Sequence, residues 1–434
     1  MRAFLDLSEI CITSKGLGDS AAECPGYAYL ANNSEPIVGA EAVSVAKLHP
    51  TQINNRYWAE LSTEPSAYNH PKIRHNADLA WYHLNRFQPA AENKDLAVLV
   101  PSSYGTETLK LLGGIFTSLG ISVSGFVNRS IAGSLTAKES NAVHVELQNH
   151  QTLLTFLENR GGVLTKTKHE KLSAFGLVRL EEHWLHIIRQ RFISSYRFDP
   201  MHLGETEQQL FMQLHQLVQE NHSAPYELKV THNDQQYIEH FSDEDLAPPF
   251  LELLTEIQSK AKKQTLILDP YFLGVPGVED AKERYLLLGN GAHFAGAELM
   301  LHGLPTNLEG MTYLDSFELN NLTEQSNDNL PTSDQSEVAD IPASHLLLAS
   351  HAYPAANYSL ELQGQKLRLS RLQSTEPSHI SYVNGQLQIG EKLDGLKVNS
   401  LPVSPGTMLK RGDVLAYGGS LEEITLISVG VEKI

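Results

Sequence analysis

The chain has 434 residues and a formal net charge of −18, with 41% hydrophobic and 19% charged side chains. This length predicts two or more domains, and the composition is that of an ordinary globular protein. The negative charge argues against nucleic acid as a main partner and against an anionic membrane surface, because both are bound through clustered Lys and Arg.

The sequence shows no targeting signal, few cysteines and many histidines. No apolar run approaches the roughly 20 residues that cross a bilayer, and the N-terminus lacks a basic region followed by a signal core. We therefore expect a cytoplasmic protein. Cys11 and Cys24 are the only cysteines, which fits a reducing compartment. The 19 histidines show no metal-ligand spacing, so we expect no metal site.

The first predicted elements are strands. The segment "RAFLDLSEICIT" predicts a strand that ends at Asp6-Leu7, then a turn and a second strand. Residues 96–105, "LAVLVPSSYG", predict a buried parallel strand, because a continuous apolar run is closed by Pro101 and small polar residues. The next segment, "GTETLKLLGGIFTSLG", has apolar residues at helical spacing, with Thr106 as the N-cap and Gly120 just past the end.

A strand in "ISVSGFV" and a helix starting in "NRSIAGSL" complete a βαβ unit. Residues 142–154, "AVHVELQNHQTLL", predict two strands whose turn is polar and contains no glycine. Further strands turn at 160–162, and an amphipathic helix is predicted over 180–192.

The middle of the chain continues this alternation. Residues 205–221 and 246–262 predict helices, and residues 226–241 predict a hairpin that turns at Asn233-Asp234. Residues 284–304, "RYLLLGNGAHFAGAELMLHGL", predict a buried strand, a glycine turn and a helix. The pattern indicates an α/β domain over residues 1–318.

The composition changes beyond this domain. Residues 319–341 contain acidic residues, no basic residue and little apolar surface, which predicts a flexible linker because such a segment cannot offset its ordering entropy. Short alternating strands separated by Gly, Asn-Gly and Gly-Asp turns occupy residues 342–434 and predict a small all-β sandwich.

Residues 1–318 resemble the actin-like ATPase superfamily, and most of all the nucleotide-binding domain of the seventy-kilodalton heat-shock chaperones. The segment "LAVLVPSSYGTETLKLLGGIFTSLGISVSGFVNRSIAG" is similar to that family's "vPa.f…r.at..Ag.iaGl.v..linePtaAa". An earlier one, "GAEAVSVAKLHPTQINNRYWAEL", resembles "G..A…..nP.nt….kr.iG". The resemblance implies a duplicated, ribonuclease H-like fold with two lobes and a cleft that takes ATP and Mg²⁺.

The first phosphate hairpin of that family, "D-L-G-T-T", is altered here. Asp6 matches, but Ser8 stands at the glycine position and Glu9 follows it. In the second hairpin, "D-L-G-G-G-T", Glu146 replaces the aspartate, and Gln148, Asn149 and His150 replace the glycines. Side chains then fill the space that phosphate oxygens need, and an anion at Glu9 repels them.

The family's adenosine turn, "V-G-G-S-T-R", is best matched by Gly289 and Gly291, with His215 and Gln216 aligned to its purine clasp. The resemblance thus implies a nucleotide site made of Asp6, Ser8, Glu146, Gln148, Gly289 and Gly291. Because the motifs are altered, we favour a pseudo-ATPase without catalytic residues that acts as a scaffold or protein-interaction module.

Three alternatives stay open. The first is an ATP-binding protein or weak ATPase that uses Asp6 and Glu146 in an atypical cleft. The second is an assembly protein of the actin superfamily. In the third, Asp6 and Glu146 have only a structural role, and they cap or pair within the ends of the sheet.

The C-terminal domain weakly resembles forkhead-associated domains. The segment "GLKVNSLPVSPGTMLKRGDVLAYGG" matches their closing strands at Gly395, Val398, Asn399, Leu409, Gly412 and Asp413, with Ser400 in place of a glycine. This resemblance implies a phosphothreonine site near Arg371, and hence a protein partner that is phosphorylated. A lipoyl-like hammerhead and a sandwich that only packs or docks are the alternatives.

Overall fold

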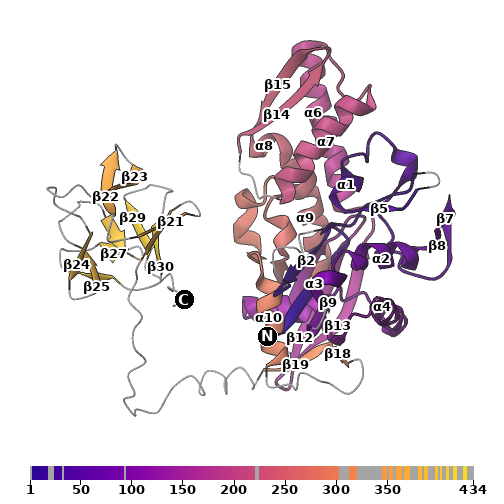
Figure 1. The fold of residues 1–434 in the computed structure, drawn as a ribbon, viewed down its shortest axis with the longest axis horizontal. Helices are drawn as coiled ribbons and strands as arrows, with labels where there is room; N and C mark the ends of the chain where they lie inside the picture. Colours follow the sequence, from indigo (N-terminus) through magenta and orange to yellow (C-terminus); the bar gives the residue numbers. More distant parts are fainter. Residues whose placement is uncertain are drawn as a thin grey trace. The chain divides into compact units, whose positions relative to one another are not determined.

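The fold comes from a computed structural model and is mixed α/β (Figure 1). It divides into two compact units, Met1–Leu330 and Pro331–Ile434, and their boundary falls within the predicted linker. The structure describes residues 2–17, 24–31, 34–91, 94–219, 224–302, 312–319, 345–348, 351–354, 358–363, 366–371, 380–383, 386–389, 396–398, 401–402, 407–409, 414–417 and 424–427. The predicted linker, apart from Leu319, lies outside these residues.

The first six-stranded sheet has the order β18-β10-β9-β1-β2-β3. β1 pairs antiparallel with β2 and parallel with β9, and β9 pairs parallel with β10. All residues of β9 are buried, as expected for a parallel strand covered on both faces. The bounds are Ala3–Asp6 for β1, Cys11–Lys15 for β2, Cys24–Pro25 for β3, Leu96–Val100 for β9, Val123–Asn128 for β10 and Thr312–Leu314 for β18.

The second six-stranded sheet has the order β17-β16-β11-β12-β13-β19. β11 pairs antiparallel with β12 and parallel with β16, and β16 pairs parallel with β17. Apart from the outer strands β18 and β19, the two sheets therefore share one strand order and one set of directions. The bounds are Ala142–Leu147 for β11, Thr152–Arg160 for β12, Val163–Leu172 for β13, Thr265–Leu268 for β16, Leu286–Leu287 for β17 and Ser316–Glu318 for β19.

Two helices lie between the sheets, α5 (Arg129–Ala137) and α10 (Ala292–Leu301), and they contact each other. Gly296 allows this contact, because a Cβ there would lie 1.9 Å from the carbonyl oxygen of Ala132. Apolar side chains of both helices and both sheets share one core, which includes Phe4, Leu157 and Ala297.

The outer faces of the sheets carry the remaining large helices. The first sheet is covered by α2 (Asn76–Asn85) and α4 (Thr106–Ser118). The second is covered by α6 (Leu177–Tyr196), α7 (Gly204–Gln219) and α9 (Pro248–Ala261). No helix in the described part of the chain is both long enough and apolar enough to cross a membrane.

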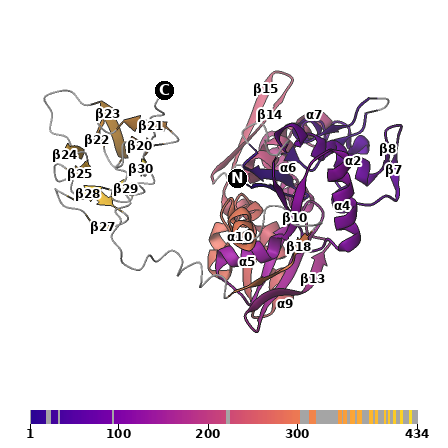
Figure 2. The same cartoon turned by 60° about the horizontal axis from the view of Figure 1, so that its bottom comes forward.

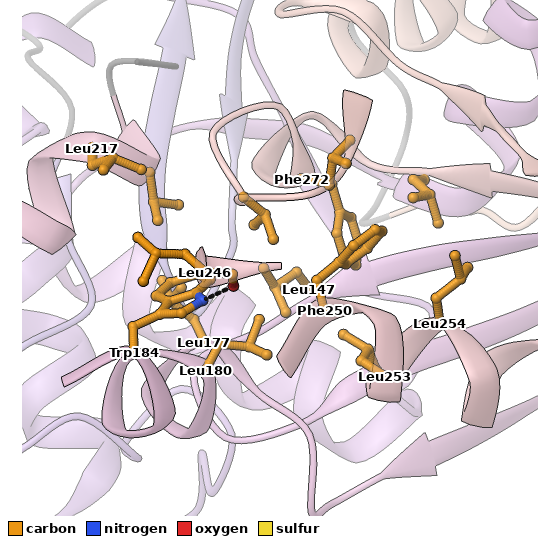
Figure 3. Packing of buried hydrophobic residues seen from close by; sticks show 14 of the residues in the cluster. Leu147, Leu177, Leu180, Trp184, Leu217, Leu246, Phe250, Leu253, Leu254 and Phe272 are labelled. Atoms are coloured by element: carbon orange, nitrogen blue, oxygen red, sulfur yellow. Dashed lines mark hydrogen bonds between the residues drawn. The ribbon is translucent and has the colours of Figure 1, made fainter. Parts of the chain in front are cut away.

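Trp184 of α6 belongs to the core on the second sheet (Figure 3). Its side chain is fully buried and its indole N–H donates to the carbonyl oxygen of Leu246 at 2.8 Å. The aromatic rings of Phe250 and Phe272 pack nearby with centroids 6.1 Å apart. The amphipathic pattern over 180–192 predicted this helix, which extends further at both ends.

Several smaller elements complete the N-terminal unit. Between β3 and α4 lie β4 (Ala28–Tyr29), β5 (Ile37–Val38), α1 (Ala40–Val43), β6 (Ile53–Asn54), β7 (Pro65–His70), β8 (Ile73–His75) and α3 (Gln88–Ala91). Between α7 and α9 lie β14 (Tyr226–His232), β15 (Gln235–Phe241) and α8 (Asp243–Leu246). Short 3-10 turns span Pro50–Gln52, Pro270–Phe272 and Glu279–Arg284.

Local signals agree with the structure at most turns. Gly120 follows α4 with φ +69°, as predicted for a glycine past a helix end. Asn233 and Asp234 both have positive φ, which is the geometry of a type I′ hairpin turn. The N-cap of α4 is Gly105, one residue earlier than the predicted cap Thr106, which is instead the first residue of the helix.

The C-terminal unit consists of strands in its described residues. β21-β20-β30-β29-β26-β27 form one sheet, β24-β25-β28 a second and β22-β23 a pair. Val398 and Leu409, two positions of the predicted pattern, are buried. Gly395, Asn399, Ser400, Gly412 and Asp413 lie outside the described residues. The bounds are His345–Leu348 for β20, His351–Pro354 for β21, Tyr358–Gln363 for β22, Lys366–Arg371 for β23, Ile380–Val383 for β24, Gln386–Ile389 for β25, Leu396–Val398 for β26, Leu401–Pro402 for β27, Met408–Leu409 for β28, Val414–Tyr417 for β29 and Ile424–Ile427 for β30.

Candidate functional site

Three carboxyl side chains meet where the two sheets approach each other. Asp6 is the last residue of β1, Glu146 lies near the end of β11, and Asp269 follows β16 directly. Asp6 is 5% exposed, and the other two are fully buried. Buried carboxylates need a countercharge or hydrogen bonds, because desolvation disfavours their charged form.

Arg129 supplies that countercharge. It is the first residue of α5, and the side chain of Asn128 caps this helix by accepting from the backbone N–H groups of the next turn. The guanidinium nitrogens lie 2.8 Å from Asp6 Oδ1, 3.3 Å from Glu146 Oε2 and 3.6 Å from Asp269 Oδ2. Arg129 is 1% exposed, so one buried cation lies among three carboxyl groups.

Neutral side chains complete the coordination of Glu146. Ser130 Oγ donates to Glu146 Oε1 at 2.7 Å, and Gln148 Nε2 donates to Glu146 Oε2 at 3.3 Å. Ser102 Oγ lies 2.7 Å from the Asn128 cap and 2.8 Å from Ser130 Oγ. Hydrogen bonds through Ser102, Asn128 and Gln148 therefore connect the charged cluster to the ends of β9, β10 and β11.

Two histidines lie beside the cluster. His293, in the first turn of α10, has Nδ1 3.4 Å from Arg129 Nη2 and 3.6 Å from Asp6 Oδ2. Its Nε2 lies 3.2 Å from Nε2 of His144. Two N–H groups cannot face each other at that distance, so at least one ring is neutral. This agrees with burial and Arg129, which together lower the pKa of His293 to about 4.

The charges of the cluster follow from burial and from Arg129. Burial raises the pKa of Asp6, but Arg129 and His293 outweigh it and hold that pKa below its usual value. Against the same burial effect, His144 and Arg129 lower the pKa of Glu146 to about 2. Burial dominates at Asp269 and raises its pKa well above normal. Arg129 thus favours the charged form of Asp6 and of Glu146, whereas burial favours the neutral form of Asp269.

The two hairpin tips that resemble phosphate-binding hairpins contact each other directly. Gln148 Oε1 accepts from the backbone N–H of Glu9 at 2.9 Å, and Asn149 Nδ2 donates to the carbonyl oxygen of Glu9 at 2.6 Å. Gln151 Nε2 donates to Glu9 Oε1 at 2.8 Å. Ser8 Oγ lies 3.4 Å from Gln148 Oε1. The polar side chains of the second tip therefore fill the space between the tips.

Close backbone packing holds both tips. A Cβ at Gly26 would lie 2.0 Å from the carbonyl oxygen of Glu9, and a Cβ at Gly176 would lie 2.5 Å from that of Asn149. The backbone N–H groups of Leu177 and Val178, at the start of α6, donate to the carbonyl oxygens of Gln148 and Asn149. The first tip is thus fixed against the turn after β3 and the second against the start of α6, and the two tips also contact each other.

Helix α7 is joined to the last residue of α1 and to the segment that follows it. Gln208 Nε2 donates to the carbonyl oxygen of Val43 at 2.9 Å, and Gln208 Oε1 accepts from the backbone N–H of Lys47 at 2.6 Å. His215, aligned to the purine clasp, is 4% exposed and its Nδ1 lies 3.1 Å from Glu181 Oε1. Tyr27 packs edge-on against the ring of His215.

Two cavities lie in this region, and they share no lining residue. The smaller, about 240 Å³, is lined among others by Asp6, Arg129, Tyr271, Gly291 and His293. The larger, about 570 Å³, is lined among others by Tyr27, Lys47, Arg56, His150 and Glu182. The hairpin tips contribute Asn149 and His150 to the larger cavity and none of their residues to the smaller one.

The predicted site residues are placed as follows. Asp6, Ser8, Glu146 and Gln148 come together in one buried network. Gly289 and Gly291 lie in an exposed turn before α10, where Gly291 has φ +79° and lines the smaller cavity together with Asp6 and Arg129. In the described part of the chain, no group of three or more His, Cys, Asp or Glu is arranged to hold a metal ion. The guanidinium lies between the carboxyl groups instead.

Sequence reasoning missed Arg129, Asp269 and both histidines of the cluster. A signal existed for two of them, since Asp269 directly follows the apolar run "TLIL" just as Asp6 ends "AFLD". Arg129 stands between a helix-capping Asn and a Ser directly after a buried strand. His144 and His293 gave no signal, because these two side chains contact each other and lie 149 residues apart in the chain.

Glu9 makes the stability of the tip contact depend on pH. Burial raises its pKa from 4.5 to about 7, against the hydrogen bond from Gln151. Its folded-state pKa exceeds the unfolded value, so the stability that this group contributes is fully present below pH 4.5 and is lost as the pH rises through 7. Glu9→Gln keeps the acceptor for Gln151 and does not titrate.

We therefore expect Glu9→Gln to match the wild type in acid and to raise the free energy of unfolding by up to about 3 kcal/mol above neutral pH. Urea denaturation on both sides of that range measures the difference. Glu252→Gln, at an exposed position of α9, is the matched control and should leave the pH profile of the wild type unchanged. An equal gain for Glu9→Gln at every pH would contradict this role.

No protein-family model matches this chain, and no curated protein matches its sequence.

Proposed function

We propose that the N-terminal unit is an actin-like, chaperone-like pseudo-ATPase that serves as a scaffold or protein-interaction module. The observation that carries this proposal is Arg129, a buried cation within 3.6 Å of Asp6, Glu146 and Asp269. In an ATP site of the actin-like kind, hydrated Mg²⁺ and phosphate occupy the space between such carboxylates. Here that space contains a side chain of the protein itself.

The arrangement of the sheets supports the fold part of the proposal. Both sheets have the strand order third, second, first, fourth, fifth, with the second strand antiparallel to the first. A repeated sheet of this kind is what a duplicated ribonuclease H-like fold requires. Asp6 and Glu146 also stand at equivalent ends of the first strand of each sheet.

The residue at position 129 supports the loss of ATP chemistry. In the family pattern "linePtaAa", which "FVNRSIAG" resembles, the residue after the asparagine is acidic, whereas this chain has Arg129. An acid at that position adds to the negative charge that attracts a metal ion. A guanidinium neutralises that charge and cannot be deprotonated in a protein.

The contacts around the cluster favour a static scaffold over a nucleotide-driven clamp. Opening the cleft would separate Gln148 and Asn149 from Glu9, and Gln208 from Val43 and Lys47. All of these polar groups are buried or partly buried, so breaking them without nucleotide in their place is unfavourable. The C-terminal unit, a separate all-β unit in its described residues, is the proposed contact for a phosphorylated protein partner.

Calorimetric titration of the full chain with ATP and Mg²⁺ tests the proposal, together with an assay of phosphate release. We expect no saturable heat and no release above that of buffer. A heat-shock chaperone nucleotide-binding domain is the positive control for both assays. Micromolar binding with turnover would overturn the pseudo-ATPase.

A second candidate is a nucleotide-binding protein that does not hydrolyse ATP. The cavity of about 240 Å³ favours it, because that cavity places Arg129 beside the exposed Gly291 turn and the Tyr271 ring. Arg129 would then contact phosphate in place of Mg²⁺. Saturable binding of ATP that does not need Mg²⁺ and yields no phosphate would favour this candidate over the first.

A further inference from the structure

The hairpin of β14 and β15 forms a two-stranded sheet at the end of the N-terminal unit (Figure 1). A two-stranded ribbon has two edges, and the edge of β14 is covered by helix α7. Gln209 Oε1 accepts from the backbone N–H of Thr231 at 2.8 Å, and its Nε2 donates to the carbonyl of Thr231 at 3.0 Å. Gln213 makes the same pair of bonds with Lys229, at 3.0 and 2.7 Å.

The spacing explains why two glutamines suit this edge. Residues four apart on a helix are separated by about 6 Å along its axis. Outward-facing residues two apart on a strand are separated by about 6.8 Å. Gln209 and Gln213 therefore follow the repeat of Lys229 and Thr231, and their amides take the place of a neighbouring strand.

The register then shows which groups of β15 are free for another strand. Lys229 and Thr231 use both backbone groups toward α7, so they belong to pairs that are not hydrogen-bonded across the hairpin. Their partners are Ile238 and Gln236. The backbone groups of Gln236 and Ile238, and by alternation those of His240, therefore point away from β14.

This edge is open in the described part of the chain. β15 pairs with no strand other than β14, and Figure 2 shows it along the margin of the unit. The one side-chain bond to its outward groups within those residues comes from Tyr196, whose hydroxyl donates to the carbonyl oxygen of Ile238. Tyr196 is 41% exposed, and a carbonyl oxygen can accept a second hydrogen bond.

The side chains of the ribbon indicate what the edge pairs with. On the outer face, Glu227, Lys229, Thr231, Gln236 and His240 are exposed and polar. Ile238 is the apolar exception on that face and is half-buried. An open edge usually carries charged side chains, above all Lys, or a Pro or a bulge that blocks association; the seven residues of β15 contain no Lys, Pro or bulge, and one acidic residue, Glu239.

We propose that β15 binds β15 of a second copy of this chain, antiparallel and centred on Ile238. This register places Ile238 directly opposite its symmetry mate, a β-branched pair that suits a sheet face. Gln236 then lies opposite His240, and Tyr237 lies opposite Glu239. No like charges face each other, so the edge is complementary to itself, and the two hairpins form one four-stranded sheet with the glutamine-covered edges outermost.

The first experiment measures the association of the full chain by sedimentation velocity over a wide range of concentrations. We expect the wild type to form a dimer as concentration rises, and Ile238→Lys to stay monomeric because it places two ammonium groups opposite each other. Thr231→Lys is the matched control, since it adds the same charge to the same face beside the covered edge. Thermal unfolding confirms that both variants are folded.

The second experiment locates the contact. Ile238→Cys should be joined to its mate by a short bismaleimide, while Thr231→Cys should not, because three strand spacings put its mate more than about 14 Å away. The native Cys11 and Cys24 are buried. A wild type that is monomeric at every concentration would overturn the proposal. So would a dimer that Thr231→Lys disrupts as much as Ile238→Lys does.

Discussion

Replacing Arg129 with methionine should lower the free energy of unfolding by about 3–5 kcal/mol at neutral pH, because it leaves buried carboxylates without their countercharge. Asp6 and Glu146 are at most 5% exposed, and neither has another cation of Lys or Arg type among its ion pairs in the described residues. Methionine keeps much of the volume of arginine, so the effect reports charge more than packing. Guanidinium denaturation at fixed pH measures it.

The stability of Arg129→Met should also depend less on pH than the stability of the wild type does. In the wild type the pKa of Glu146 is lowered to about 2, so its stabilising contribution is present above the unfolded value of 4.5 and is lost as the pH falls through 2. Without Arg129 the pKa of Glu146 is lowered less and that contribution shrinks, so the gap between Arg129→Met and the wild type should be widest near neutral pH and narrow in acid. Calorimetric unfolding midpoints across this range provide the measurement.

Two comparisons keep this prediction specific. Arg179→Met removes a guanidinium whose side chain is 56% exposed and pairs with Glu182, so it should change stability by less than about 1 kcal/mol. Adding Glu146→Gln to Arg129→Met removes one unpaired charge and should recover part of the loss. If Arg129→Met lowered the free energy of unfolding as little as Arg179→Met does, the stability of the cluster would not depend on its cation.

Replacing Trp184 with alanine should cost about 3–5 kcal/mol of stability, from lost burial and from the cavity that remains. The indole lies between α6 and α8 in the core of Figure 3, where it is fully buried and donates to the Leu246 carbonyl oxygen. Alanine leaves that carbonyl without this donor, which adds to the cost. Urea denaturation, with the slope checked for two-state behaviour, gives the value.

Trp184→Phe separates the two causes, since it keeps most of the apolar contact and removes the N–H donor. The free energy of unfolding of Trp184→Phe should lie between that of the wild type and that of Trp184→Ala. Leu251→Ala, on the exposed face of α9, should stay within about 0.5 kcal/mol of the wild type. A loss of that small size for Trp184→Ala would mean that the core relaxes around the missing ring.

The elements with strong local periodicity could be predicted from the sequence. The helices α4, α6, α7 and α9, the buried strand β9 and the hairpin of β14 and β15 were all predicted, with their ends correct to within a few residues. The hairpin turn was located by Asn233-Asp234, and Gly120 marked a helix end. Each of these signals acts between residues that are neighbours in the chain.

The short elements of residues 24–91 were not predicted. β4, β5, β6 and α1 contain two to four residues each, too few for a periodic pattern. Their strands pair with partners far along the chain, such as Tyr29 with Ile53. They form because the tertiary fold supplies neighbours, and local propensity has little part in them.

The sequence by itself determined an acidic, mixed α/β chain in which the glycines of two resembled phosphate hairpins are absent, and it placed Asp6 and Glu146 at strand ends. Only the tertiary structure decided what those residues do. It placed Arg129 between them, brought Asp269 and His293 to the same point, and locked Gln148 and Asn149 onto Glu9. The physical reason is that a buried charge is stabilised by the charged and polar groups that lie close to it in space. These groups can be far apart in the sequence, so local sequence patterns do not reveal them.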